Sequence, residues 1–292
     1  MQKLSDSELI INPDGSIYHL NLLPDQLAPT IITVGDPERV EKITQHFDKV
    51  EVIVRKREFH TQTGTYKGKR LTVISTGIGT DNIDIVMNEL DALVNIDFHT
   101  RTIKKNLTSL EIIRIGTSGS LQQEIPVDSF LASEIGVGLD ALLHFYKNEG
   151  IQEIELREAL IKNLYGGAIK SSPYCVTADA QLLSRFDLPQ VFRGITATNI
   201  GFYGPQGRVL RLPLADPGLN EKISAFSFQG KKITNMEMET SAIYALSKLL
   251  GHRAISLNAI IANRVTGDFS SDPVKAVDRL IEFTLDRLVN YD

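Results

Sequence analysis

Cysteines, long apolar runs and an apolar stretch near its beginning are the first features that the sequence lacks or has little of. Its 292 residues contain one cysteine, Cys175, which excludes a disulfide framework within the chain and indicates a reducing compartment. No apolar run approaches the roughly 18 residues of a membrane span. The sequence begins MQKLSDSELIINPDGS, which is polar and has no apolar segment of the kind found in signal peptides. We therefore expect a cytoplasmic protein that does not bind membranes.

An excess of positive charge is also lacking. The chain has 31 Lys and Arg residues against 36 Asp and Glu residues, a formal net charge of −5. Nucleic-acid binding needs a positive field, so we expect no nucleic-acid partner. A few arginines can still form a local site for a small anion. The 42% of hydrophobic and 23% of charged residues are ordinary for a globular protein with a sizeable core.

Several catalytic motifs are absent as well. There is no GxxxxGK[ST] motif, which argues against a P-loop enzyme, and no HExxH motif. The six histidines are scattered, so we predict no metal site of the zinc type. No GxGxxG motif opens a helix, which disfavours a dinucleotide enzyme. The segment Gly116–Ser120 (GTSGS) resembles the turn of serine hydrolases but lacks its second glycine at the required position.

The stretch Glu111–Gln122 (EIIRIGTSGSLQ) contains the first positive indication of a site. An apolar strand runs up to Arg114, and the glycines and hydroxyls of Gly116–Ser120 predict a loop after it. Open α/β sheets bind ligands at the carboxyl ends of their strands. An arginine beside a hydroxyl and exposed backbone N–H groups suits an anion, with phosphate as the first candidate. A surface arginine beside an ordinary turn is the alternative that this stretch leaves open.

The order of predicted strands and helices indicates an α/β domain. Glycine-containing loops follow the predicted strands Thr30–Val34 and Leu71–Ser75 as well as the strand before Gly116. This alternation predicts a largely parallel sheet with helices on both faces. We expect residues 1–28 to form an N-terminal arm rather than a core element, and residues 29–292 to form one domain.

Further elements follow from hydrophobic periodicity. We predict helices at Glu38–Phe47, Ile83–Leu93, Gln152–Leu164, Asn220–Phe228, Glu239–Leu250 and Val274–Leu288, and strands at Val50–Arg55, Glu58–Tyr66, Pro126–Val137, Ala168–Val176, Lys232–Met236 and Arg253–Ala262. The basic stretch Asn95–Leu110 is expected to be a surface excursion. The stretch Phe186–Pro217 is predicted to be a long irregular loop, and loops of that kind are usually functional or disordered.

Four stretches resemble the nucleoside phosphorylase superfamily and, within it, the uridine phosphorylase branch. They are Gly35–Ile43 (GDPERVEKI), Ser75–Gly79 (STGIG), Arg114–Gly119 (RIGTSG) and Asn235–Glu239 (NMEME), in the family's order and across most of the chain. The resemblance implies an α/β fold in one domain, with a mixed central β-sheet partly closed into a barrel and surrounded by α-helices. It also implies a homodimer or homohexamer whose active sites lie at the dimer interface.

The activity that the resemblance implies is that of a pentosyltransferase. Such enzymes catalyse the reversible phosphorolysis of a nucleoside to ribose 1-phosphate and the free base. Inorganic phosphate is a co-substrate, and no cofactor is expected. Members of the uridine branch can hold a potassium ion between subunits, and the corresponding position in this sequence is near Glu58 and Ser75.

The resemblance also assigns phosphate-binding groups. By similarity these are the backbone of Gly35, the side chains of Arg39, Arg114 and Thr117, and Arg57 reaching in from the neighbouring subunit. The assignment is chemically reasonable, because a phosphate that attacks the anomeric carbon must be gripped by several cations and N–H donors.

The ribose is assigned to a second set of residues. Glu239 matches the ribose-binding glutamate of the family, with Met238 packing against the sugar and Thr117 between sugar and phosphate. A carboxylate there can stabilise an oxocarbenium-like transition state. Glu237 remains a competing carboxylate, because residues two apart in an extended segment share a face. His19 matches a histidine that bonds the ribose 5′-hydroxyl from the neighbouring subunit.

The base is assigned to the segment that contains Phe202, Gln206 and Arg208. A glutamine, both donor and acceptor, and an arginine two residues later complement the edge of uracil, and Phe202 is placed to stack on its ring. Arg208 would also stabilise the leaving uracil, so Arg208, Gln206 and Glu239 are the predicted catalytic residues. The purine branch uses a late aspartate that is missing from Ala262–Thr266. Uridine and phosphate are therefore the predicted ligands.

Some features depart from the family, and other functions stay open. Thr80–Asn82 replaces the glycine or small residues that usually follow the second motif, and residues 95–110 and 186–197 form longer stretches than in compact members. A purine nucleoside phosphorylase, a nucleosidase and a non-catalytic nucleoside-binding protein are the alternatives. The three arginines at phosphate positions argue against the last two.

Overall fold

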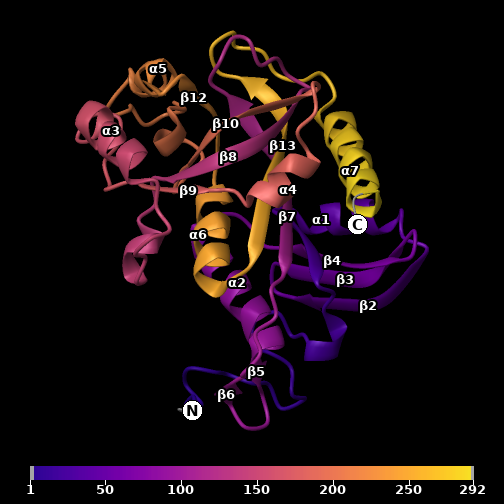
Figure 1. The fold of residues 1–292 in the computed structure, drawn as a ribbon. Helices are drawn as coiled ribbons and strands as arrows, with labels where there is room; N and C mark the ends of the chain where they lie inside the picture. Colours follow the sequence, from indigo (N-terminus) through magenta and orange to yellow (C-terminus); the bar gives the residue numbers. More distant parts are fainter. Residues whose placement is uncertain (1–2, 291–292) are drawn as a thin grey trace.

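The strands of the computed structural model, which describes residues 3–290, form one large sheet and one small hairpin (Figure 1). The strands are β1 (Thr30–Val34), β2 (Lys49–Lys56), β3 (Phe59–Tyr66), β4 (Lys69–Ser75), β5 (Ile96–Asp97), β6 (Thr102–Ile103), β7 (Glu111–Ser120), β8 (Phe130–Gly138), β9 (Tyr174–Thr177), β10 (Val191–Thr198), β11 (Ser227–Phe228), β12 (Lys231–Glu237) and β13 (Arg253–Asn263). The large sheet has 11 strands in the order β11-β12-β10-β8-β13-β7-β1-β4-β3-β2, with β9 paired to β8.

Five strands of the large sheet close into a ring. Strand β12 pairs with β10 on one side and with β7 on the other, where Asn235 lies opposite Ser120 and Met236 opposite Gly119. The ring therefore runs β12-β10-β8-β13-β7, and β1, β4, β3 and β2 continue from it as an open sheet. Parallel and antiparallel pairs both occur, which corrects the largely parallel sheet expected from the alternation alone. The predicted α/β fold with a mixed, partly closed sheet is confirmed.

Helices surround this sheet. They are α1 (Pro37–Thr44), α2 (Thr80–Asn95), α3 (Ile154–Leu164), α4 (Ala180–Arg185), α5 (Leu219–Ala225), α6 (Thr240–Leu250) and α7 (Pro273–Val289), with the short 3-10 helices η1 (Pro24–Gln26), η2 (Leu142–Phe145) and η3 (Gly204–Gln206). All but α4 and the three 3-10 helices fall within a few residues of predicted helices.

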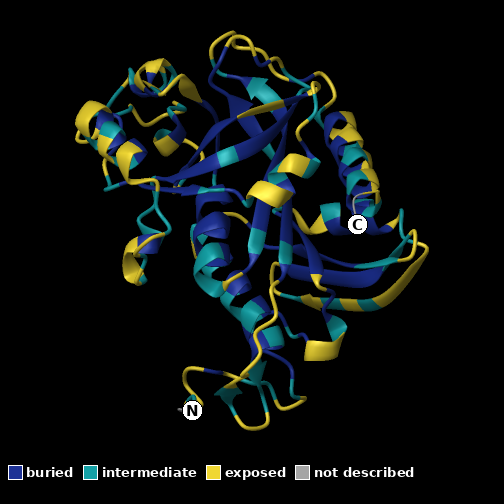
Figure 2. Cartoon of the chain, viewed as in Figure 1, coloured by how far each residue is buried: buried dark blue, intermediate teal, exposed yellow. Residues whose placement is uncertain are grey.

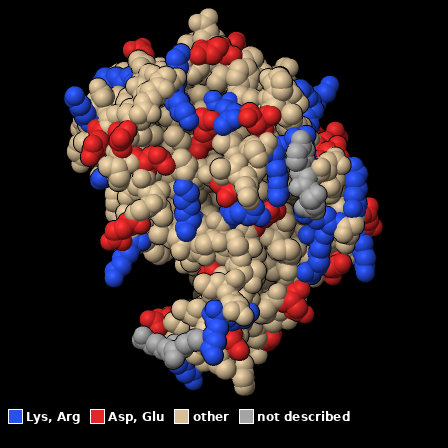
Figure 3. Space-filling view, in the orientation of Figure 1, with Lys and Arg blue, Asp and Glu red and all other residues tan. Residues whose placement is uncertain are grey.

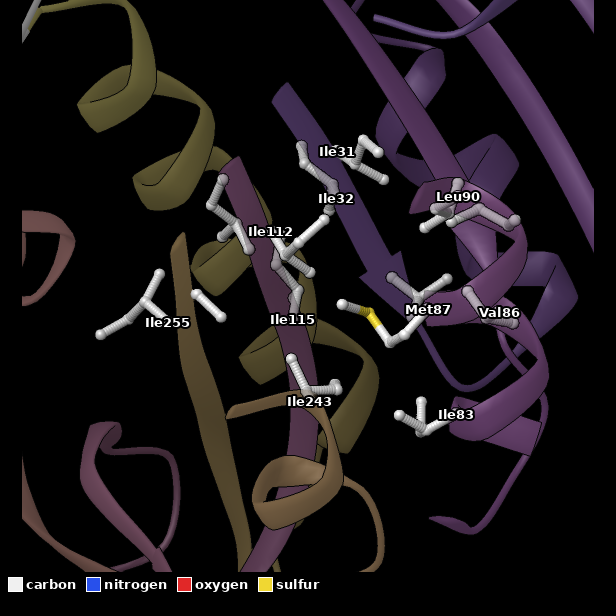
Figure 4. Packing of buried hydrophobic residues seen from close by; sticks show 14 of the residues in the cluster. Ile31, Ile32, Ile83, Val86, Met87, Leu90, Ile112, Ile115, Ile243 and Ile255 are labelled. Carbon is white, nitrogen blue, oxygen red and sulfur yellow. The ribbon is translucent and has the colours of Figure 1, made fainter. Parts of the chain in front are cut away.

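The core lies between the strands and the helices α2 and α6. On α2 the buried residues Ile83, Val86, Met87, Leu90 and Leu93 recur at helical spacing and form one apolar face. Figure 4 shows this face directed at β1 and β7, with Ile243 of α6 beside Ile83 and Met87. Each such side chain stabilises the fold by about 1.5–3 kcal/mol relative to an exposed one. The core therefore holds β1, β7 and β13 rigidly, and the carboxyl ends of these strands carry the candidate site.

The segment before β1 packs into the same core. Leu9, Ile17, Leu20, Leu22 and Leu27 are all buried members of the main hydrophobic cluster. Apart from η1 the described part of this segment has no helix or strand longer than a single bridge. The expected arm is therefore irregular in backbone, but its side chains are tied to the body of the protein.

The predicted loop at Gly116–Ser120 is wrong, because β7 continues through it to Ser120. Strand β13 pairs with β7 along the whole length of β7, so residues 116–120 are paired with β13 as part of the sheet. Gly116 is therefore a strand residue and not a turn residue. A Cβ atom at this position would lie 1.9 Å from Nη1 of Arg114, whose guanidinium covers the strand at that point. Glycine inside a strand often marks such a close approach.

The predicted irregular loop at Phe186–Pro217 is wrong in its first half, which contains β10. This strand mixes apolar residues with an arginine, a glycine and two threonines, and it has a register shift after Gly194, opposite β8. Thr234 packs against Gly194, where a Cβ atom would lie 2.2 Å from the threonine methyl group. Because of this mixed composition, the sequence did not indicate that a strand at the centre of the sheet lies here. The predicted strand at Ala168–Val176 is also shorter in the structure, where β9 spans only Tyr174–Thr177 and buries Cys175.

Burial and charge are distributed over the molecule as in an ordinary globular domain. Figure 2 shows the ring strands buried and the edge strand β2 mostly exposed. Basic and acidic side chains are interspersed over the face seen in Figure 3. Among residues 3–290, no helix is both long enough and apolar enough to cross a membrane.

Candidate active site

A cavity of about 550 Å³ lies at the carboxyl ends of β1, β12 and β13, beside the second half of β7. This volume is typical of a small-molecule site. Most residues that the sequence predicts for the site line this one cavity. They are Gly35, Arg39, Arg114, Thr117, Phe202, Gln206, Arg208, Met238 and Glu239.

A second, larger cavity of about 830 Å³ is lined by other residues of the same loop, Tyr203, Gly204 and Pro205 among them. Its walls are mainly apolar, with Leu210, Leu212 and Leu214 among them. It contains none of the predicted phosphate or ribose groups. We therefore take the smaller cavity as the candidate active site, because the buried ion pairs of Arg114 and the predicted phosphate and ribose groups lie there.

Arg114 is the buried centre of that convergence, with 5% of its surface exposed. Its Nη2 donates to Glu239 at 2.6 Å and lies 3.1 Å from an oxygen of Glu237, and its Nη1 donates to Asn258 at 2.9 Å. Burial alone would lower the pKa of Arg114, but the two carboxylates outweigh it and raise the pKa. A buried guanidinium without these partners would be strongly destabilising. The sequence indicated a cation at this point, but its two carboxylate partners were not predicted.

The two competing carboxylates have different partners. Glu237 accepts hydrogen bonds from the backbone N–H groups of Glu239 and Thr240 and from the hydroxyl of Thr198. It thus satisfies the otherwise unpaired N–H groups at the start of α6. Glu239 accepts from the N–H of Gly79 at 2.9 Å and from Arg114. Burial, together with the charge of Glu237, raises the pKa of Glu239, and Arg114 opposes that rise.

The start of α1 adds further groups to the cavity beside Arg114, Glu237 and Glu239. Asp36 caps this helix by accepting from the N–H of Glu38 at 2.9 Å, and Arg39 follows in the first turn. The N-termini of helices favour anions through their free N–H groups and their dipole. Arg39 donates to the carbonyl of Ile115 at 3.3 Å. Burial and the nearby charge of Arg114 lower the pKa of Arg39, and both arginines line the same cavity.

The base end of the cavity is a loop around η3. The Nη1 of Arg208 donates to the side-chain oxygen of Gln206 and to the carbonyl of Phe202, both at 2.7 Å. Its guanidinium carbon lies 3.8 Å from the centre of the Phe202 ring. Burial, and then the charge of Arg264, lower the pKa of Arg208 to about 10, so Arg208 remains a cation at neutral pH. The spacing of Gln206 and Arg208 therefore produces a paired amide and guanidinium stacked on an aromatic ring.

Arg264 is a residue beside the cavity that sequence reasoning missed. Its Nη2 donates to the carbonyl of Gly207 at 3.3 Å, and its side chain packs over Gly119 of β7. It thus brings a second positive charge next to Arg208. The arginine lies in the same stretch as the missing aspartate of the purine branch, and its presence there was the available signal.

His19 and Arg57 lie outside the cavity of their own chain. Tyr18 connects them, because the Arg57 guanidinium carbon lies 5.9 Å from its ring centre and the His19 ring packs edge-on at 4.6 Å. Both residues were predicted to act in a neighbouring subunit. The two side chains thus belong to one cluster on the surface of the protomer.

The motif Ser75–Gly79 and the residues after it, Thr80–Asn82, which differ from the family, lie near the site. Gly77 has a positive φ of 71°, and the side chain of Asn82 packs where a Cβ atom of Gly77 would lie. Ser75, near the predicted potassium position, donates from its hydroxyl to the carbonyl of Glu58 and accepts from the N–H of His60, both at 2.7 Å. Among residues 3–290 no group of three or more His, Cys, Asp and Glu side chains is placed to hold a metal ion.

The fold brings the buried Arg114 of β7 between the carboxylates of Glu237 and Glu239, an arrangement that can bind an anion and stabilise a developing positive charge. The chain belongs to the phosphorylase superfamily, whose family model matches residues 29–289. The predicted superfamily is therefore confirmed, and the protein is an enzyme of the nucleoside phosphorylase family.

Individual relatives are similar over nearly the whole chain. A uridine phosphorylase of Thermococcus kodakarensis is 30% identical over 278 residues, covering 92% of this chain and 85% of the relative. A DeoD-type purine nucleoside phosphorylase of Hahella chejuensis is 26% identical over 281 residues, covering 94% and 98%. The crystal structure of a Trypanosoma brucei nucleoside phosphorylase with uridine phosphorylase activity has a TM-score of 0.86 at 31% identity, covering 97% of this chain and 99% of that chain.

Proposed function

We propose that the protein is a uridine phosphorylase, which converts uridine and phosphate to uracil and ribose 1-phosphate. The observation that carries the proposal is the pair of Gln206 and Arg208 in the same cavity as Arg114 and Glu239. Relatives named for uridine and for purine nucleosides are both similar to this chain. The choice of base therefore rests on the chemistry of the loop around η3.

The phosphate is proposed to lie between the start of α1 and β7. The backbone of Gly35, the guanidinium of Arg39, the hydroxyl of Thr117 and Arg114 would surround it. The adjacent positive charges of Arg39 and Arg114 support this position, because an anion between them relieves their repulsion. A phosphate oxygen would then attack the anomeric carbon from this side.

The ribose is proposed to lie against Met238 and Glu239. As the C1′–N1 bond breaks, its electron pair passes to uracil and positive charge develops on the sugar ring. The buried Glu239 carboxylate would stabilise this charge and accept hydrogen bonds from ribose hydroxyls. We assign this part to Glu239 rather than to Glu237, since Glu237 already accepts from two N–H groups and a hydroxyl around the start of α6.

Uracil is proposed to lie on the loop around η3. The amide of Gln206 and the guanidinium of Arg208 offer a donor and acceptor set that complements two carbonyls and the N–H between them. Phe202 can stack on the base with the ring face that Arg208 leaves free. Arg208 and the neighbouring Arg264 would stabilise the negative charge that builds on uracil as it leaves.

The active unit is proposed to be a dimer or a larger homo-oligomer built from dimers. Within one protomer the charge of Arg114 is opposed by the carboxylates of Glu237 and Glu239. A phosphate dianion needs further positive charge, and Arg57 of a second copy would supply it. The chemistry acts on free nucleoside and phosphate, and the only cysteine of the chain is buried, so a cytoplasmic location fits.

The first experiment is to incubate the protein with uridine, with and without phosphate, and to measure free uracil. Release that depends on phosphate is the expected result. Release without phosphate would identify a nucleosidase instead, and binding of uridine without release would identify a non-catalytic binder.

Inosine in the same assay distinguishes the purine alternative. We expect turnover of inosine to be at least roughly 100-fold below that of uridine, since a cavity built to hydrogen-bond uracil leaves polar groups unpaired against a purine. Faster release of hypoxanthine than of uracil would contradict the proposal.

A further inference from the structure

One carboxylate of α2 holds His19 in place. Glu89 accepts from the backbone N–H of His19, at 3.0 Å to each of its oxygens, and from the N–H of Leu20 at 2.8 Å. One oxygen of Glu89 also lies 2.7 Å from Nδ1 of the His19 ring. Three donors therefore converge on a single carboxylate whose side chain is only 12% exposed.

The contact with Glu89 decides which nitrogen of the His19 ring carries a proton. A carboxylate can only accept hydrogen bonds, so Nδ1 of His19 must carry a proton. The other ring nitrogen, Nε2, lies on the far side of the ring from Glu89. In a neutral ring it is an acceptor, and in a protonated ring it is a donor. Contacts with Glu89 and Tyr18 thus fix the ring and leave Nε2 as the atom for a ligand.

We propose that Glu89 is a positioning residue for nucleoside binding. It orients His19 so that Nε2 meets the 5′-hydroxyl of the nucleoside bound in the cavity of a second copy. This inference rests on the proposed function, in which His19 serves a neighbouring subunit. A carboxylate that orients a histidine through Nδ1 is a common device at sites where the other nitrogen works.

The position requires a carboxylate rather than any side chain of its size. Glutamine has one accepting oxygen, and its amide nitrogen would face an N–H group or Nδ1–H, so a donor would be left unpaired. Glu89→Gln should therefore free the ring without changing the shape of α2. Glu89→Asp keeps both oxygens and should retain most of the effect.

The experiment compares uridine with 5′-deoxyuridine, which lacks only the 5′-hydroxyl. We measure kcat/KM for both nucleosides in the wild type, in Glu89→Gln, in His19→Ala and in the double variant. For uridine we expect a fall of about tenfold in each single variant, near the effect of one hydrogen bond, and no further fall in the double variant. For 5′-deoxyuridine we expect changes within about twofold.

Asp97→Asn is the matched control, because Asp97 also accepts from two backbone N–H groups, those of His99 and Thr100. It should change kcat/KM for neither nucleoside. Nitrogen-15 spectra of the His19 ring give a second readout, with Nδ1 protonated in the wild type and a mixture of tautomers in Glu89→Gln.

The outcomes separate the two proposals. A wild type that releases no uracil overturns the proposed function, and with it this inference. If the wild type is active, an equal loss on both nucleosides in Glu89→Gln overturns this inference alone, since Glu89 would then serve only the fold. Unchanged activity on uridine in Glu89→Gln overturns it as well.

Discussion

The two ends of the candidate active site are built in different ways. The phosphate and ribose end consists of strand ends and helix starts, and Arg114, Glu237 and Glu239 are each at most 6% exposed there. The base end is a loop around η3, where Gln206 is buried but Phe202 is 50% exposed. The phosphate and ribose end is therefore part of the protein core, whereas the base end is a loop on the surface of that core.

This difference has an energetic consequence. A buried ion cluster is stable only when every charge has its partner, so the phosphate and ribose end cannot change without affecting the fold. A half-exposed loop can change its side chains at little cost in stability. The reacting groups and the base-selecting groups therefore belong to parts of the molecule with different tolerance to substitution.

The largest expected effect is that of Arg114→Met. The change leaves Glu237 and Glu239 buried without their counter-ion, and we expect a loss of roughly 3–5 kcal/mol in the free energy of unfolding. Phosphorolysis should fall by roughly 10³-fold or more, about the effect of removing one strong electrostatic contact from a transition state. Urea unfolding and steady-state kinetics measure the two losses. A variant as stable as the wild type would show that the fold does not depend on this ion cluster.

Arg208→Ala should show the opposite pattern at the base end. We expect kcat/KM for uridine to fall by about 10²-fold, with the KM for phosphate and the free energy of unfolding nearly unchanged. Arg211→Ala is the matched control, since Arg211 is an exposed arginine three residues later on the same loop. Equal losses for uridine and phosphate would contradict the division of the site into two ends.

The smallest expected effect concerns His60, which braces the start of α1. Gln62 donates to its Nε2 at 3.1 Å, so Nδ1 carries the proton and donates to the carbonyl of Pro37 at 3.2 Å. Burial lowers the pKa of His60 from its usual 6.5, and Arg55 adds to this, against the opposing effects of the Pro37 carbonyl and Glu41. His60 is therefore neutral in the folded protein at neutral pH.

The sign of the pH dependence follows from this shift. The unfolded chain takes up the proton at a higher pH than the folded chain, so this contribution to stability is complete above pH 6.5. It is lost as the pH falls through the lower pKa of the folded state. Unfolding in urea at about pH 7 and about pH 5 should show a smaller decrease in stability for His60→Gln than for the wild type. His99→Gln, at an exposed histidine, should behave like the wild type.

Much of the site could be predicted because its residues occur in short motifs at strand ends. Gly35 follows β1, and Met238 and Glu239 follow β12, so the end of each strand fixes where its next residues lie. Neighbouring strand ends meet at one edge of the sheet. Motifs far apart in the chain were therefore expected to line one cavity, and they do.

The two strand segments that were predicted as loops were missed for a common reason. Gly116 and Gly194 favour loops when only the sequence is considered, but both lie inside strands where another side chain needs the space. Glycine has the same local signature in a turn and at a close contact. Only the partner across the contact, Arg114 or Thr234, distinguishes the two.

The sequence by itself determined the family, and through the family resemblance it indicated the partly closed α/β fold and several of the residues that line the cavity, because these follow from short local motifs. Tertiary structure alone decided how those residues are paired. Arg114 binds Glu239 across 125 positions of the chain, and His19 meets Glu89 across 70. Such pairs depend on strand order and helix packing, which bring distant residues together without leaving any signal in the spacing along the chain.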